Sequence, residues 1–127
     1  MNSRITTGIN GLDDVLQGGI PKGHCLLISG SCGTGKTVMS SQFLFEGAKK
    51  QERGLYLALS EPREKMIRNM SGFSFFDETV LDSGEVKIVD VTKGARLSGV
   101  GLSNVQGLID LIREFIEEHK SDRIVID

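Results

Sequence analysis

The sequence predicts an α/β fold in which a mostly parallel β-sheet is covered by helices on both faces. Short apolar segments and amphipathic segments alternate along the chain, which is typical of strands alternating with helices. The short segments are mostly apolar and lack a strict alternation with polar residues, as expected for strands buried on both faces. Right-handed crossovers through the helices would then place these strands parallel to one another.

The N-terminal region is expected to begin with a short helix. This helix would cover residues 10–17, with Asn10 as its cap and the Gly18-Gly19 pair at its end. Its apolar face would carry Leu12, Val15 and Leu16.

Two strand–helix pairs follow in the first half of the chain. A strand over Cys25–Ser29 leads through a glycine-rich turn to a helix from about Lys36 to Lys50. A second strand covers Leu55–Leu59, and Pro62 suits the first turn of the helix after it. The buried face of that helix would contain Met66, Ile67 and Met70.

The middle of the chain is less regular. Residues 73–81 favour neither a helix nor a strand, and both interpretations stay open. A third strand is predicted over Val86–Val91, and a loop would extend from there to Leu102.

The last helix and strand have the clearest patterns. Ser103 and Gln106 match a capping box, which opens a helix that ends near Lys120. A final strand over Ile124–Ile126 places the carboxylate of Asp127 at its carboxyl end. The apolar stripe of the helix consists of Val105, Leu108, Ile109, Ile112, Phe115 and Ile116.

The composition is that of one ordinary globular domain. The 127 residues include 15 Lys+Arg and 17 Asp+Glu, so the net charge of −2 lacks the basic excess typical of nucleic-acid binding, and no nucleic-acid partner is expected. The apolar runs are far shorter than the roughly 18 residues of a membrane span. With no signal-peptide pattern, we expect no membrane partner and a cytoplasmic location. The two cysteines and two histidines have no metal-ligand spacing.

Residues 30–37 match the phosphate-loop pattern G-x-x-x-x-G-K-[ST] between a predicted strand and a predicted helix. Glycines let backbone N–H groups turn toward an oxyanion, and the helix N-terminus adds partial positive charge. Lys36 would contact the β- and γ-phosphates, and the Thr37 hydroxyl would ligate Mg²⁺. A glycine-rich turn without a ligand is the alternative. The candidate nucleotide-binding residues are Gly30, Ser31, Cys32, Gly33, Thr34, Gly35, Lys36 and Thr37.

Three further side chains would lie at the same sheet edge. Asp127 is a candidate Mg²⁺ ligand, and the alternative is a turn-forming aspartate. Glu61 and Lys36 are the candidate catalytic residues. Glu61 would orient or deprotonate the attacking water. Its alternative role is to stabilise a helix N-terminus by its negative charge. Cys32 is either a reactive thiol in the field of the loop or a small filler residue.

The stretch from Ile5 to Gly23, followed by the phosphate loop, resembles the KaiC-like branch of the RecA-superfamily ATPases. The resemblance continues through residues 55–69, 86–91 and 123–127. It implies a three-layer P-loop NTPase core of the RecA type, with ATP and Mg²⁺ as cofactors. It also implies a homo-oligomeric ring with nucleotide between subunits. Circadian-clock autokinases and archaeal signalling proteins belong to this group.

Residue by residue, the resemblance supports Lys36 and Thr37 as nucleotide and Mg²⁺ contacts and Asp127 as the carboxylate of the second motif. Glu61 would belong to a catalytic acid pair, but Ser60 stands where the family commonly has the first acid. Domains of this group continue past Asp127, so residues 1–127 would form a truncated ATP-binding domain, incomplete at its C-terminus. The strand that follows the second motif in the family lies between the phosphate-loop strand and the Asp127 strand. Here either the sheet closes differently or another chain fills the gap.

Three functions therefore follow as expectations. The first is Mg-ATP binding, with ATP hydrolysis or a role in signal transduction. The alternative is a nucleotide-dependent regulatory or oligomerisation module without turnover. A DNA recombination or repair ATPase rests only on superfamily kinship.

Overall fold

A three-stranded parallel sheet forms the centre of the computed structural model, which describes residues 3–31, 33–97, 99, 101 and 104–127. Strand β3 (Gly54–Ala58) lies between β4 (Val86–Asp90) and β5 (Arg123–Ile126), in the order β4-β3-β5. Both pairings are parallel, and Gly54 is opposite Val86 on one side and Arg123 on the other. The predicted parallel sheet is confirmed.

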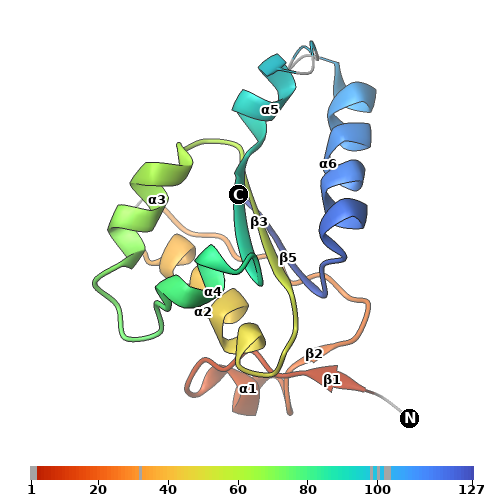
Figure 1. The fold of residues 1–127 in the computed structure, drawn as a ribbon. Coiled ribbons are helices and arrows are strands. Elements are labelled where there is room, and N and C mark those ends of the chain that lie inside the picture. Colours follow the sequence, from red (N-terminus) through yellow and green to blue (C-terminus); the bar gives the residue numbers. More distant parts are fainter. Residues whose placement is uncertain (1–2, 32, 98, 100, 102–103) are drawn as a thin grey trace.

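Helices cover both faces of this sheet (Figure 1). On one face lie α2 (Lys36–Ala48), α3 (Arg63–Met70) and α4 (Glu78–Asp82). On the other face lie α5 (Val91–Leu97) and α6 (Val105–His119). The α/β class and its three layers therefore agree with the sequence prediction.

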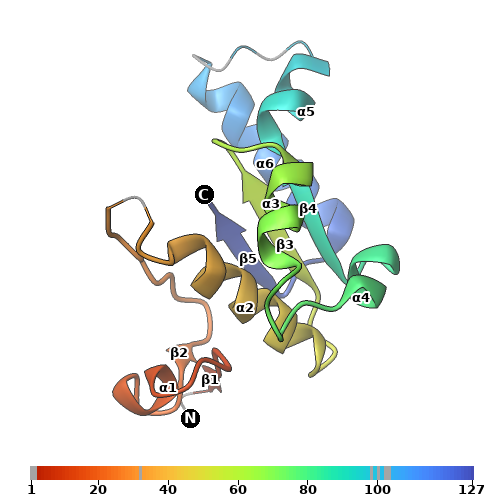
Figure 2. The same ribbon diagram turned by 90° about the vertical axis from the view of Figure 1, so that its left-hand side faces the viewer.

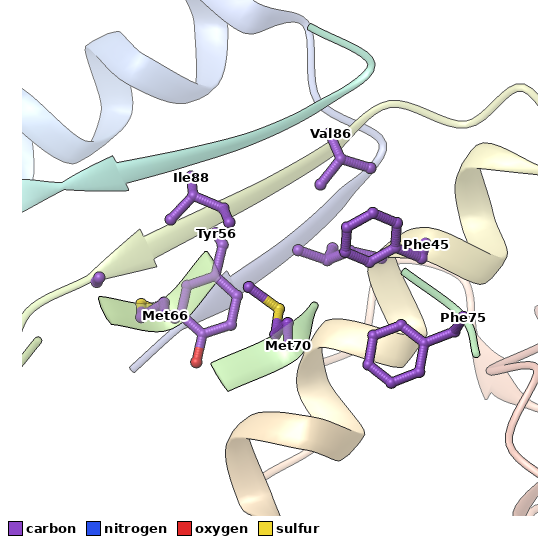
Figure 3. Packing of buried hydrophobic residues seen from close by; sticks show 9 residues of the cluster. Phe45, Tyr56, Met66, Met70, Phe75, Val86 and Ile88 are labelled. Atoms are coloured by element: carbon purple, nitrogen blue, oxygen red, sulfur yellow. The ribbon is translucent and has the colours of Figure 1, made fainter. Parts of the chain in front are cut away.

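The two apolar clusters meet at β3, whose five residues are all buried. Because successive side chains of a strand point to opposite faces, Tyr56 and Ala58 join one cluster while Leu55 and Leu57 join the other. Figure 3 shows Tyr56 among Phe45, Met66, Met70, Phe75, Val86 and Ile88, the other labelled members of the larger cluster.

The N-terminal region differs from the prediction. Residues Arg4–Ile5 (β1) and Ile20–Pro21 (β2) form an antiparallel pair that the sequence did not indicate. Helix α1 covers only Leu12–Val15, and its N-cap is Gly11 in the left-handed conformation, so the prediction of Asn10 as cap is wrong. Val15, predicted on the apolar face, is exposed.

The Asp13 carboxylate organises this region. It accepts hydrogen bonds from the backbone N–H and the hydroxyl of Thr7, both at 2.8 Å, and from the backbone N–H of Gly8 at 3.1 Å. The side chain thus fixes the loop before α1, which explains why a helix this short begins one residue later than expected.

The predicted strand over Cys25–Ser29 is wrong. These residues have no regular secondary structure, and Leu27 is 90% exposed. An apolar segment becomes a strand only when a neighbouring strand supplies hydrogen bonds, and within the described residues β5 pairs with β3 alone. In Figure 2 this orange segment runs beside α2 and apart from the three strands.

Two elements begin differently from the prediction because single polar side chains cap them. Helix α5 replaces the predicted loop after β4, because Asp90 ends the strand and accepts a hydrogen bond from the N–H of Lys93 at 3.1 Å. In the ambiguous segment 73–81, Asp77 caps α4 by accepting from the N–H of Thr79 at 3.0 Å.

Helix boundaries elsewhere shift by one or two residues. Pro62 is the N-cap of α3 and not part of its first turn. Asn104 caps α6 by accepting from the N–H of Gly107 at 3.0 Å. Ser103, the predicted capping-box residue, lies outside the described residues.

Arg123 links the start of β5 to α2 and the turn after it. The side chain is buried, with 2% of the residue exposed, and its guanidinium donates to the Phe43 carbonyl at 2.8 Å. It also pairs with the Glu52 carboxylate at 3.2 Å and lies 4.6 Å from the centroid of the Phe43 ring. A buried charge is stable only when paired and hydrogen-bonded, as it is here.

Gly47 on α2 leaves the space that this arginine occupies. A methyl group at Gly47 would collide with Cδ and Nε of Arg123, which is held by its hydrogen bonds. We expect Gly47→Ala to lower the free energy of unfolding by about 1–3 kcal/mol, the usual range for overpacking a core. Urea unfolding measures the change. Gly72→Ala is the matched control, because a Cβ there meets no atom within 4 Å, and an equal loss in both variants would contradict the prediction.

The Asp13 loop makes part of the stability pH-dependent. Partial burial raises the pKa of Asp13, but the hydrogen bonds from Thr7 and Gly8 outweigh it and hold the pKa below its usual 3.8. A depressed carboxyl pKa stabilises the fold above the unfolded-state pKa, and this contribution is lost as the pH falls through the folded-state pKa. Asp13→Asn should therefore destabilise the chain more at pH 7 than at an acidic pH below the lowered folded-state pKa of Asp13. Urea unfolding at neutral and at acidic pH tests this, with the exposed Asp14→Asn as control. A difference in free energy of unfolding between Asp13→Asn and wild type that does not change with pH would contradict the prediction.

Candidate functional site

The N-terminus of α2 is open to a ligand. The helix begins at Lys36, its N-cap Gly35 has φ +93°, and no side chain caps it. Its first turn contains no acidic residue. The first N–H groups of a helix have no intrahelical partner, so an uncapped start of this kind favours an anion.

The loop before α2 is closed by hydrogen bonds across it. The Thr34 hydroxyl donates to the Ser31 carbonyl at 2.7 Å, and the Lys36 ammonium donates to the Gly30 carbonyl at 2.5 Å. A Cβ at Gly30 would lie 2.7 Å from the Thr34 hydroxyl oxygen, so the close turn requires glycine there. Gly33 has φ +79°, a conformation that glycine adopts without strain.

Seven of the eight predicted loop residues are thus described, and they form a compact turn at the start of α2. The partly exposed Lys36 side chain keeps donors available beyond its carbonyl partner, because an ammonium group has three. Cys32 lies outside the described residues, so the interpretation of its thiol stays a prediction.

Asp127 is fixed at the carboxyl end of β5. Its backbone N–H donates to the Leu57 carbonyl at 3.0 Å, and its carbonyl accepts from the N–H of Leu59 at 2.6 Å. The Thr37 hydroxyl donates to its Oδ2 across 3.4 Å. The two residues predicted to hold Mg²⁺ are 90 positions apart in sequence and lie side by side in the fold.

Tyr56 is a site residue that the sequence analysis missed. Its hydroxyl donates to Oδ2 of Asp127 at 2.6 Å, although the residue itself is only 1% exposed. Burial raises the pKa of Tyr56, the hydrogen bond to Asp127 and its negative charge raise it further, and Thr37 opposes the shift. A buried tyrosine hydroxyl needs a hydrogen-bond partner. The single hydroxyl in this otherwise apolar strand could therefore have indicated a polar group nearby.

Glu61 lies near this group but makes a different contact. Its carboxylate pairs with Lys65, one turn into α3, at 3.8 Å and stays partly exposed. Its negative charge is the smallest of the causes that raise the pKa of Tyr56. The structure therefore brings Thr37, Tyr56 and Asp127 into contact, whereas Glu61 is paired with Lys65.

The oxygen atoms of Thr37 and Asp127 are suitable ligands for a hard cation. Mg²⁺ prefers oxygen ligands and keeps several waters or phosphate oxygens, so one hydroxyl and one carboxylate are a suitable protein contribution. Among the described residues, no three His, Cys, Asp or Glu side chains gather into a metal cluster. None of the helices in the described ranges combines the length and apolar character that crossing a lipid bilayer requires.

Comparisons with known proteins identify the family of this chain. A family model described as "ATPase: KaiC" matches residues 5–127. A UPF0273 protein of Pyrococcus horikoshii is 34% identical over 139 aligned residues, which cover all of this chain and 55% of that protein. A circadian clock oscillator protein KaiC of Parathermosynechococcus lividus is 37% identical over 125 residues, covering 95% of this chain and 23% of that protein.

Solved structures give the same result. The crystal structure of a KaiC-like protein from Pyrococcus horikoshii superimposes with a TM-score of 0.82 at 30% identity, covering all of this chain and 54% of that one. The chain thus spans about half the length of this protein and of the UPF0273 relative. At the level of the family, the match supports nucleotide binding. The family model, the relatives and the superposition together place this chain in the KaiC-like ATPase family of the RecA superfamily.

Proposed function

We propose that residues 1–127 act as one domain that binds Mg-ATP at the carboxyl edge of the sheet. The observation that carries this proposal is the approach of Thr37 to Asp127 within 3.4 Å, directly beside the phosphate loop. A phosphate-loop sequence alone predicts an anion site. The addition of an oxygen pair at its edge makes a metal-bound triphosphate the ligand that fits best.

Each residue then has a defined role in binding. The loop from Gly30 to Gly35, including Cys32, would surround the phosphates with its backbone N–H groups. Lys36 would add a full positive charge at the β- and γ-phosphates. Thr37 and Asp127 would hold Mg²⁺, which neutralises phosphate charge when it is bound.

Hydrolysis is the finer part of the proposal, and it rests on Glu61. Its carboxylate follows β3 and would orient or deprotonate a water molecule attacking the γ-phosphate. In this conformation the carboxylate is paired with Lys65, so it must leave that contact to reach a water near the phosphates. Surface ion pairs of this kind contribute at most about 1 kcal/mol, so breaking the contact between Glu61 and Lys65 has a small free-energy cost.

A regulatory module without turnover is the second candidate function. Two observations favour it: the engagement of Glu61 with Lys65, and Ser60 at the position before it. In that case nucleotide would stabilise an oligomer, which we propose to be a homo-oligomeric ring, and signal through assembly. For either candidate we propose a cytoplasmic setting. A DNA recombination role has no supporting observation.

Lys36→Ala should weaken binding of Mg-ATP, measured by calorimetric titration, because the variant removes the full positive charge that Lys36 adds at the end of the loop. We expect the affinity to fall by at least about tenfold, the equivalent of one lost charge-assisted contact of roughly 1.5–3 kcal/mol. Lys22→Ala is the matched control, since Lys22 is an exposed lysine that precedes the loop. A folded wild-type chain that binds no Mg-ATP would overturn the proposed function.

Glu61→Gln separates the two candidates. If Glu61 acts on the attacking water, steady-state phosphate release should fall about 100-fold or more, in line with general-base removal. Glu64→Gln is the control, because Glu64 is an exposed acid in the first turn of α3. Turnover in the wild type that stays unchanged in Glu61→Gln would remove Glu61 from the mechanism. ATP binding with no turnover, together with a larger mass by light scattering, would favour the regulatory module.

A further inference from the structure

Tyr56 reaches Asp127 because of the register between β3 and β5. Tyr56 is opposite Val125, so its side chain is on the same face of the sheet as Asp127, two residues further along. That face is the one covered by α2, whose first turn carries Thr37. A phenol is long enough to span this diagonal, and its hydroxyl meets Oδ2 at 2.6 Å.

The ring is held firmly while the carboxylate is not. Tyr56 packs in the larger apolar cluster, and Figure 3 shows its ring between Met66 and Met70 with the hydroxyl oxygen pointing away from β3. Asp127 is exposed. An exposed carboxylate is free to rotate about its side-chain bonds, and a hydrogen bond to an immobile partner removes much of that freedom.

The two donors to Asp127 are unequal. At 2.6 Å the Tyr56 contact has the length of a strong hydroxyl–carboxylate hydrogen bond, whereas the Thr37 contact at 3.4 Å is long and weak. Both donate to Oδ2, and within the described residues Oδ1 accepts no hydrogen bond. The arrangement holds one oxygen in place and leaves the other available.

We infer that Tyr56 is a positioning residue for the magnesium site: its hydroxyl anchors Oδ2 of Asp127 so that Oδ1 stays directed for a divalent cation on bound nucleotide. This inference rests on the proposed function and deepens it. Residues that orient a metal ligand are commonly worth 10- to 100-fold in metal affinity, so the loss of this hydroxyl should be measurable.

The test is the effect of Mg²⁺ on ATP affinity, measured as the ratio of Kd in EDTA to Kd with Mg²⁺. Tyr56→Phe keeps the ring and its packing but removes the donor. We expect the ratio to fall about tenfold or more relative to wild type, while ATP affinity in EDTA stays the same. Thr7→Val is the matched control, because Thr7 is also a buried residue whose hydroxyl donates to an aspartate carboxylate, at 2.8 Å, in the N-terminal loop.

The outcomes are separable. A Tyr56→Phe ratio equal to that of wild type would overturn the inference and leave the proposed function intact. A wild type whose ATP affinity does not respond to Mg²⁺ would overturn the proposed function and the inference with it. Equal losses in Tyr56→Phe and Thr7→Val would assign the effect to general stability and overturn the positioning role.

A second measurement covers the case in which Tyr56→Phe does not fold. The chain has one tyrosine and no tryptophan, so its ultraviolet emission reports on Tyr56 alone. Adding Mg²⁺ to the ATP-bound wild type should change this emission, because the cation alters the carboxylate to which the phenol donates. The change should vanish in Asp127→Asn, and its persistence there would overturn the inference.

Discussion

Strand β3 has no surface left for water, because helices cover both of its faces and a parallel strand lies along each edge. Its central position fixes the register of β5, and that register determines which side chains meet at the carboxyl edge. Even its first residue is closely packed, since a Cβ at Gly54 would lie 3.2 Å from Leu44 of α2. The packing of this strand therefore sets the distance between the phosphate-loop helix and the sheet.

Helix α2 and strand β5 are joined at both of their ends, and the two contacts serve different purposes. At one end the buried Arg123 ties β5 to Phe43 and Glu52 through its guanidinium. At the other end the partly exposed Thr37 makes a long hydrogen bond to the exposed Asp127. The buried ion pair and the exposed carboxylate thus lie at opposite ends of β5, and Oδ1 of Asp127, which accepts no hydrogen bond among the described residues, stays available for binding. Such a division is common where binding requires groups that folding has not satisfied.

Local patterns were sufficient for α2, β3, β4 and α6, because each has a periodicity or a run of apolar residues that depends only on its own sequence. The strand predicted over Cys25–Ser29 was wrong because strand formation depends on a neighbour that the pattern cannot supply. Helix α5 was missed because Asp90 serves both as the last residue of β4 and as the cap. Thr37 and Asp127 were assigned to one magnesium site on the premise of a strand over Cys25–Ser29, which is absent, and their contact arises from the packing of α2 on the sheet. Tyr56 could be found only from the register of β3 and β5. His119, which the sequence did not single out, is buried, and its two ring nitrogens contact the Ser121 hydroxyl and the Gly84 carbonyl.

The 90-residue separation between Thr37 and Asp127 has a thermodynamic consequence. Bringing two such distant residues together costs loop-closure entropy, and a ligand that contacts both acts as a reversible cross-link across that loop. Nucleotide binding and the docking of β5 against β3 are then linked equilibria, each favouring the other. Nucleotide bound at the phosphate loop and at Asp127 would therefore also raise the free energy of unfolding of this chain.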